Sequence, residues 1–195
     1  MKRIVMIVMP VLVGLLVCGA TSRSKVSKVK FPASTELCGI RIGDSVQSVW
    51  QKYGRPTKPQ ANLVFDYNDP KKKVNLIVFI DQKKKTADEI CMGQGKNSRA
   101  RTATKPFAHL GHRGIIIDST KKDVERVFGR FTTMSMETED QENMRQAYFK
   151  VDSPPGDKSC AIKIVFENDK VIEICSRYLA SWIVEDIKKE GGWNE

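Results

Sequence analysis

The sequence lacks the residue patterns on which most enzymes and metal proteins depend. It contains only two histidines, His109 and His112, and no Cys-x-x-Cys pair of the kind found in zinc and redox sites. The two histidines are three residues apart, but Arg113 beside them opposes a cation. Residues 93–96 do not have the spacing of a phosphate-binding loop. We therefore expect no catalytic residues, no metal and no cofactor.

The sequence also lacks an apolar run long enough for a comfortable membrane span. Its longest run, residues 4–17, follows a short basic start and precedes the small residues Cys18-Gly19-Ala20, a pattern typical of a secretory signal peptide. We predict a signal peptide at residues 1–20, cleaved after Ala20, and a basic spacer at 21–36. The protein is then exported, to the periplasm or out of the cell.

Two alternatives to simple cleavage stay open. Residues 15–18 partly match a lipoprotein cleavage box, in which Cys18 would be lipidated and anchor the protein, although Val17 is too bulky for that box. The basic residues that follow the apolar run could instead keep an uncleaved anchor in place.

Without Cys18, the cysteines that remain are even in number, which fits an oxidising compartment. They are Cys38, Cys91, Cys160 and Cys175. Two disulfides are plausible and three pairings are possible; Cys38–Cys91 with Cys160–Cys175 keeps one bridge in each half of the chain. The second requires a bulge near Cys160, because a two-residue turn at residues 168–169 leaves its cysteines on diagonal positions. Four reduced, buried thiols are the alternative.

One phrase occurs twice in the chain: GIRIGDSVQSVWQKYGRPT at residues 39–57 and GIIIDSTKKDVERVFGRFT at 114–132. Self-similarity of this kind indicates a duplicated unit. Each copy predicts a short helix, capped by Asp44 or Ser45 in the first and by Thr120 in the second. Apolar residues at helical spacing lead to a terminating glycine in both copies: Val46, Val49, Trp50, Tyr53 and Gly54, then Val124, Val127, Phe128 and Gly129.

Strand patterns follow each helix. They cover residues 63–68, 74–80 and 88–92 in the first half, and 146–151, 161–167 and 171–177 in the second. We predict an α+β fold of two tandem repeats, 37–95 and 114–178, joined by a basic linker at 96–113. Each repeat is a short helix packed on a three-stranded, or four-stranded, antiparallel meander. A C-terminal helix and tail occupy 179–195, and the helix is expected to dock on the second meander through Leu179, Trp182, Ile183 and Ile187.

The repeated phrase, a helix ending in an aromatic residue and glycine, and a following meander together resemble a known family. They are similar to the repeat of the β-lactamase-inhibitor-protein-like fold and of the SmpA/OmlA outer-membrane lipoprotein domain, over nearly all of residues 37–178. The resemblance implies a cell-envelope or secreted protein that works by contact, as an inhibitor or an assembly factor, without catalytic residues. The matching positions are scaffold positions: Val49, Tyr53, Gly54, Val124, Phe128 and Gly129.

Charge offers two candidate surfaces. The net charge is +10, with a basic first half and linker and an acidic second half. Two lysine runs in predicted turns are most simply solvated tips, but they could contact an anionic partner: Lys71, Lys72, Lys73, Lys83, Lys84 and Lys85. No aromatic residues interleave with these lysines, so a nucleic-acid partner is not expected.

The second surface is an acidic insertion in the second half, which we interpret as a mobile loop. Its methionines, Met134, Met136 and Met144, could serve an adaptable protein contact or, less simply, bind copper. We expect a non-enzymatic binding module that contacts another envelope or extracellular protein. The alternative is a basic protein that binds an anionic membrane surface or polymer, whose contacts would weaken with ionic strength.

Overall fold

The computed structural model describes residues 35–56, 63–136, 143–151 and 158–195. The predicted signal peptide, Cys18, most of the spacer and the acidic stretch 137–142 lie outside the described residues. Within the described ranges, no helix is both long enough and apolar enough to cross a membrane.

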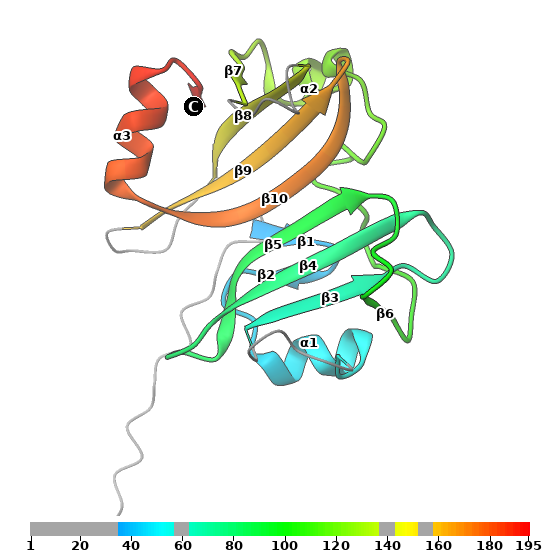
Figure 1. The fold of residues 1–195 in the computed structure, drawn as a ribbon. Coiled ribbons are helices and arrows are strands. Elements are labelled where there is room, and N and C mark those ends of the chain that lie inside the picture. Colours follow the sequence, from blue (N-terminus) through cyan, green and yellow to red (C-terminus); the bar gives the residue numbers. More distant parts are fainter. Residues whose placement is uncertain (1–34, 57–62, 137–142, 152–157) are drawn as a thin grey trace, which may run out of the picture.

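A nine-stranded, mostly antiparallel sheet runs through both halves of the described chain (Figure 1). Its order is β11-β8-β9-β10-β5-β4-β3-β6, with β7 paired to β8. The strands are β3 (Val64–Asn68), β4 (Val74–Asp81), β5 (Thr86–Gln94), β6 (Arg101–Thr102), β7 (Met134–Ser135), β8 (Met144–Val151), β9 (Lys158–Glu167), β10 (Lys170–Ala180) and β11 (Trp193–Asn194). A separate hairpin joins β1 (Glu36–Leu37) to β2 (Ile40–Arg41).

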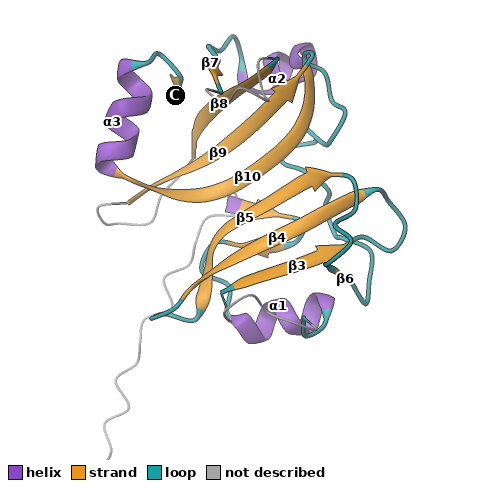
Figure 2. Cartoon of the chain, in the orientation of Figure 1, coloured by secondary structure: helices purple, strands orange, loops and turns teal. Residues whose placement is uncertain are grey.

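Three helices complete the described part of an α+β fold (Figure 2). They are α1 (Val46–Tyr53), α2 (Lys121–Phe128) and α3 (Ser181–Lys189). The six long strands and the three helices are those that the sequence predicts. The short strands β1, β2, β6, β7 and β11 were not predicted, because two residues carry no readable periodicity.

The first helix begins at a side-chain cap. Ser45 accepts a hydrogen bond from the backbone N–H of Ser48, 3.1 Å away, so Ser45 is the cap and Asp44 is not. Asp44 instead accepts a hydrogen bond from the backbone of Arg41. The helix ends at Gly54, whose φ of 88° favours glycine.

The second helix has a complete capping box, in which Thr120 and Asp123 exchange side-chain to backbone hydrogen bonds. Val124 is buried on its inner face, as expected. Val127 was predicted to share that face, but 37% of it is exposed. This helix has only about two turns, so its buried apolar face is narrow. Val127 lies outside that face and is exposed to solvent.

The chain before each of these helices is tied to its own meander by the same backbone hydrogen bonds. In each half, the backbone N–H of one residue before the helix donates a hydrogen bond to the carbonyl of a residue at the start of the third strand. The carbonyl of the next residue accepts a hydrogen bond from the N–H of that same strand residue. The pairs are Gly43 and Asp44 with Ala87, and Asp118 and Ser119 with Val171. The two halves therefore share this local geometry, while their origin as two copies of one unit stays a prediction.

The main apolar core lies on one face of the sheet and draws on both halves of the chain. The helices α1 and α2 and the hairpin β1–β2 pack against it. The predicted basic linker at 96–113 also contributes to this core, because Ala103 and Phe107 are buried in it. Residues 96–113 are thus part of the folded body.

The C-terminal helix α3 packs on the opposite face of the sheet, over the second meander, as predicted. Val184 and Ile187 join Tyr148 and Leu179 in a second, smaller core. Trp182 was expected in the same stripe but is 68% exposed, because Val184 takes the inward position. This helix therefore covers part of a sheet face that is otherwise uncovered by described helices (Figure 1).

One glycine is essential to the packing of residues 110–116. Gly111 has a φ of 82°, and a Cβ placed there would lie 1.7 Å from the carbonyl oxygen of Ile115. Gly95 has a similar φ of 88°, with nothing within 4 Å of its Cβ position. We expect Gly111→Ala to lower the free energy of unfolding by about 3 kcal/mol or more, because the backbone must move.

Gly95→Ala is the matched control, since it adds conformational strain alone, on the order of 1 kcal/mol. Denaturant unfolding of both oxidised variants measures the difference. Equal losses of stability would contradict the close approach at Gly111.

Candidate functional site

The sheet face opposite the main core carries a mixture of apolar and charged side chains that described helices leave uncovered. Register places these side chains in neighbouring rows across five strands. One row runs Asp66, Ile77, Cys91, Cys175 and Lys163, and the next runs Val64, Phe79, Glu89 and Arg177. We call this surface the open face. It comprises Val64, Asp66, Asn75, Ile77, Phe79, Glu89, Cys91, Lys163, Glu173, Cys175 and Arg177.

A disulfide lies in the middle of the open face, between Cys91 of β5 and Cys175 of β10. Their Cα atoms are 4.1 Å apart and directly opposite in the antiparallel register. The bond closes a sequence separation of 84 residues and joins the two meanders. In the chain-entropy model, a loop of that length corresponds to roughly 4–5 kcal/mol of stabilisation.

The pairing with one bridge in each half, Cys38–Cys91 with Cys160–Cys175, is therefore not the one that forms. A register shift between Val171 and Glu173 places Cys175 opposite Lys163, and Cys160 opposite Tyr178. Because alternate residues point to opposite faces, one added residue turns Cys175 away from Cys160. The pairing required a bulge near Cys160, whereas the bulge in this hairpin lies in β10, at the end far from Cys160.

Cys38 fails to reach Cys91 for a similar reason. It lies in the turn between β1 and β2, on the core side of the sheet, and its Sγ is 3.4 Å from the Sδ of Met92. Met92 and Cys91 are neighbours in β5 and so face opposite sides. Burial raises the pKa of the Cys38 thiol to about 12, so it stays protonated at neutral pH.

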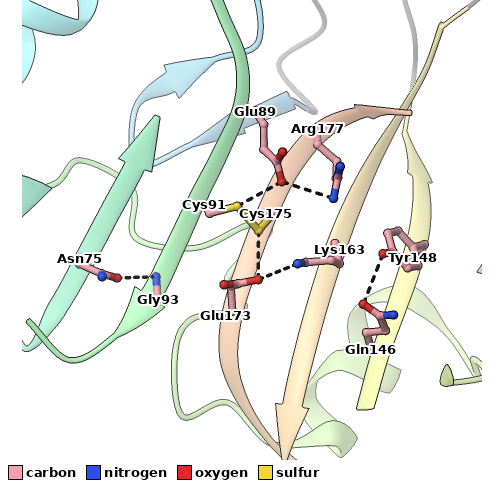
Figure 3. Close-up of a disulfide and its surroundings, with 10 residues drawn as sticks. All are labelled: Asn75, Glu89, Cys91, Gly93, Gln146, Tyr148, Lys163, Glu173, Cys175 and Arg177. Atoms are coloured by element: carbon pink, nitrogen blue, oxygen red, sulfur yellow. Dashed lines mark hydrogen bonds and ion pairs between the residues drawn. A yellow bond between two sulfur atoms is a disulfide. The ribbon is translucent and has the colours of Figure 1, made fainter. Parts of the chain in front are cut away.

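Two ion pairs flank the disulfide (Figure 3). Glu173 lies 2.7 Å from Lys163 across the β9–β10 pair, and Glu89 lies 3.5 Å from Arg177 across the joint between the meanders. Burial raises the pKa of Glu89, while Arg177 and Lys163 act in the opposite direction. The two carboxylates beside the disulfide are thus compensated within the protein, whereas Asp66, whose pKa is raised by burial, has no ion pair with a described residue.

The same cluster holds the only group of metal-ligating atoms found among the described residues. An oxygen of Glu89 and the sulfurs of Cys91 and Cys175 lie within 4.8 Å of one another. With the disulfide formed, neither sulfur is a thiolate, which is the form that binds metal. In the oxidised protein a metal ion would therefore find one carboxylate ligand here, that of Glu89, with the positive charges of Arg177 and Lys163 nearby.

The other end of the open face carries apolar side chains around Asp66. Phe79 is 38% exposed in the second half of β4, which is a high exposure for a phenylalanine in a sheet. Val64 and Ile77 are half-buried beside it. Exposed apolar side chains that gather next to compensated charges are typical of a protein-contact surface.

The six lysines of the predicted turns are all exposed. Asp69 and Asp81 fix the two turns, because each carboxylate accepts hydrogen bonds from two lysine backbone N–H groups. The turns lie at opposite ends of the eight-residue strand β4, roughly 26 Å apart at 3.3 Å per residue. They therefore do not form one basic surface.

The three methionines of the predicted contact loop do not share one environment. Met134 packs against the second core, where a Cβ on Gly192 would lie 2.1 Å from its Sδ. Met144 begins β8, and Met136 and Met144 bracket residues that lie outside the described part. Met134 is thus a packing residue, while the contact role of the loop stays a prediction.

The two histidines differ in environment. His109 is exposed, whereas His112 is 4% exposed and stacks on Phe128 with ring centroids 6.0 Å apart. Burial lowers the pKa of His112 to about 4, against a backbone hydrogen bond at Glu36 that raises it. Sequence reasoning placed both histidines in a linker, and no local pattern marks His112 as a core residue.

Comparison with protein-family models, with curated proteins and with solved structures finds no match to this chain. The function must therefore be argued from the open face itself.

Acid should destabilise the protein through His112. The unfolded chain binds a proton at this imidazole near pH 6.5, and the folded chain only near pH 4, so stability falls as the pH drops from about 7 toward 4. The loss attributable to His112 is about 3 kcal/mol at its largest. His112→Gln should flatten the pH dependence of the free energy of unfolding over this range.

His109→Gln is the control, because it makes the same substitution at an exposed side chain. The measurement is denaturant unfolding at several pH values. If the free energy of unfolding of the His112→Gln protein depends on pH as steeply as that of the parent, His112 is not buried in its neutral form.

Proposed function

We propose that the protein is an exported, non-enzymatic binding module that contacts another envelope or extracellular protein through the open face of its sheet. The observation that carries the proposal is the exposed Phe79 on the open face, beside Val64 and Ile77 and next to a disulfide flanked by two ion pairs. Protein interfaces commonly combine an apolar cluster with polar groups around it.

The shape of the sheet supports the same proposal. Pairing of β5 with β10 joins the two meanders edge to edge, so the open face extends over strands from both halves (Figure 1). We infer that the two meanders are tandem repeats, and the shared hydrogen bonds ahead of α1 and α2 support this. An inhibitor-like or assembly-factor-like role, by contact alone, is what the resemblance of the repeated phrase implies, and we propose it for this surface.

The disulfide supports export. Disulfides persist in oxidising compartments and are rare in a reducing cytosol. Cys91 and Cys175 are each less than 10% exposed, and their bond joins the two halves, as expected of a structural disulfide. A signal peptide at residues 1–20 would supply the route, with lipidation of Cys18 as the alternative.

Binding to an anionic membrane or polymer is the weaker proposal. The lysine turns are separated by the length of β4 and do not converge on one surface. Each lysine turn could attract an anion, but no contact among the described residues brings the two turns together on one anion-binding surface.

Intact mass and disulfide mapping of the protein from its native host test export. We expect a chain that begins after Ala20, a disulfide-linked peptide pair containing Cys91 and Cys175, and thiols at Cys38 and Cys160 that react with a blocking reagent only after unfolding. A diacylglyceryl group on Cys18 would select the lipoprotein alternative. A chain that starts at Met1 with Cys91 and Cys175 reduced would overturn export.

Site-specific photo-crosslinking tests the contact surface. A photo-reactive residue at Phe79, in cells of the native host, should give a discrete protein adduct that survives high salt, because an apolar contact is little screened. Adding Ile77→Glu should abolish it, since a buried unpaired carboxylate is costly. The binding loss should be at least about tenfold, or 1.4 kcal/mol.

Val127 is the matched control position, because it is 37% exposed and lies on α2, on the other side of the sheet. The same photo-reactive residue at Val127 should give no such adduct. Equal adducts from both positions, or an adduct at position 79 that is insensitive to Ile77→Glu, would contradict a specific contact at the open face.

A further inference from the structure

A separate cavity of about 660 Å³ is lined by residues at the start of β4 and the end of β5. Figure 1 shows these two strand ends side by side. Its volume is within the usual range for small-molecule sites. It opens on the core side, and its lining comes from the first meander and from residues 110–118, which lead into α2. All of its lining residues belong to the described chain.

The floor of this cavity is apolar. Val74 and Met92 are buried members of the main core, and Leu110 packs against that core from the facing segment. Ile116 also lines the cavity and is 41% exposed. An apolar chain that covered Ile116 would gain burial, and it would extend the existing core.

The wall of the cavity is fixed before any ligand binds. Residues His112 and Ile115 exchange two backbone hydrogen bonds of 2.9 Å. The close approach of Gly111 to Ile115 holds this turn against its neighbours. A ligand would therefore enter a preformed site with a small cost in ordering the chain.

The rim of the cavity is charged. Lys72 and Lys73 border it on the β4 side and are exposed, and neither forms a salt bridge with a described residue. Asp118 borders the opposite side, where Gln94 donates a hydrogen bond to its carboxylate over 3.3 Å. The rim thus offers two exposed ammonium groups, of which Lys72 also acts on the Asp69 carboxylate and lowers its pKa, and one carboxylate that is already hydrogen-bonded.

We propose that this cavity binds a small amphiphile with a single anionic head group, such as a medium-chain fatty acid. The apolar floor accepts the tail, and Lys72 and Lys73 hold the carboxylate at the mouth. The site lies on the core side of the sheet, away from the open face, and so does not depend on the contact proposed there.

Three ligands with the same tail and different head groups test this proposal: octanoate, 1-octanol and octylamine. Each is titrated below its micelle-forming concentration into the full disulfide-bonded chain labelled with ¹⁵N. The amides of Gly95, Leu110 and Ile116 should shift in a saturable way. Octanoate should bind about fivefold more tightly than octanol, the factor expected from one exposed ion pair, and octylamine should bind most weakly.

Variants separate the head group from the tail. Lys72→Met with Lys73→Met should remove the preference for octanoate, whereas Lys84→Met with Lys85→Met, which makes the same charge change at the far turn, should keep it. Ile116→Asn should weaken all three ligands and leave the fold intact, because Ile116 is already partly exposed. Absence of saturable binding, equal binding of octylamine and octanoate, or shifts centred on Phe79 would overturn the proposal.

Discussion

The pairing of β5 with β10 is the interaction on which the rest of the structure depends. It joins two three-stranded meanders into one sheet with a shared core. Cys91 and Cys175 lie directly opposite each other within this pairing, so the covalent bond is placed where separation of the halves would begin. The open face and the fatty-acid-sized cavity both require that the two halves stay joined.

A single irregularity decides what the open face contains. The register shift between Val171 and Glu173 sets which residues of β10 point away from the core. It places Cys175 against Cys91 and Arg177 opposite Glu89. Without the shift these side chains would point into the core, where unpaired charges are costly. The bulge therefore explains the disulfide, the ion pairs and the position of the thiols together.

The elements that could be predicted from the sequence are those with local signals. Caps, terminating glycines and apolar periodicity located α1, α2, α3 and the six long strands. The β5–β10 pairing was missed because partner choice between strands far apart in sequence leaves no local pattern. The disulfide was missed with it, since it depends on both that pairing and the bulge. His112 was missed because its burial comes from Phe128 on a helix that follows it.

The charges beside the disulfide are paired asymmetrically. Cys91 and Cys175 end the matching triplets Glu89-Ile90-Cys91 and Glu173-Ile174-Cys175, and the strands pair about this point. Glu89 meets Arg177, but Glu173 faces Gly93 and pairs with Lys163 of the next strand instead. These two carboxylates are therefore compensated within the protein, whereas Asp66, opposite Ile77, has no ion pair with a described residue. Covering this surface would bury the two paired carboxylates at little electrostatic cost, and the unpaired Asp66 would add to that cost.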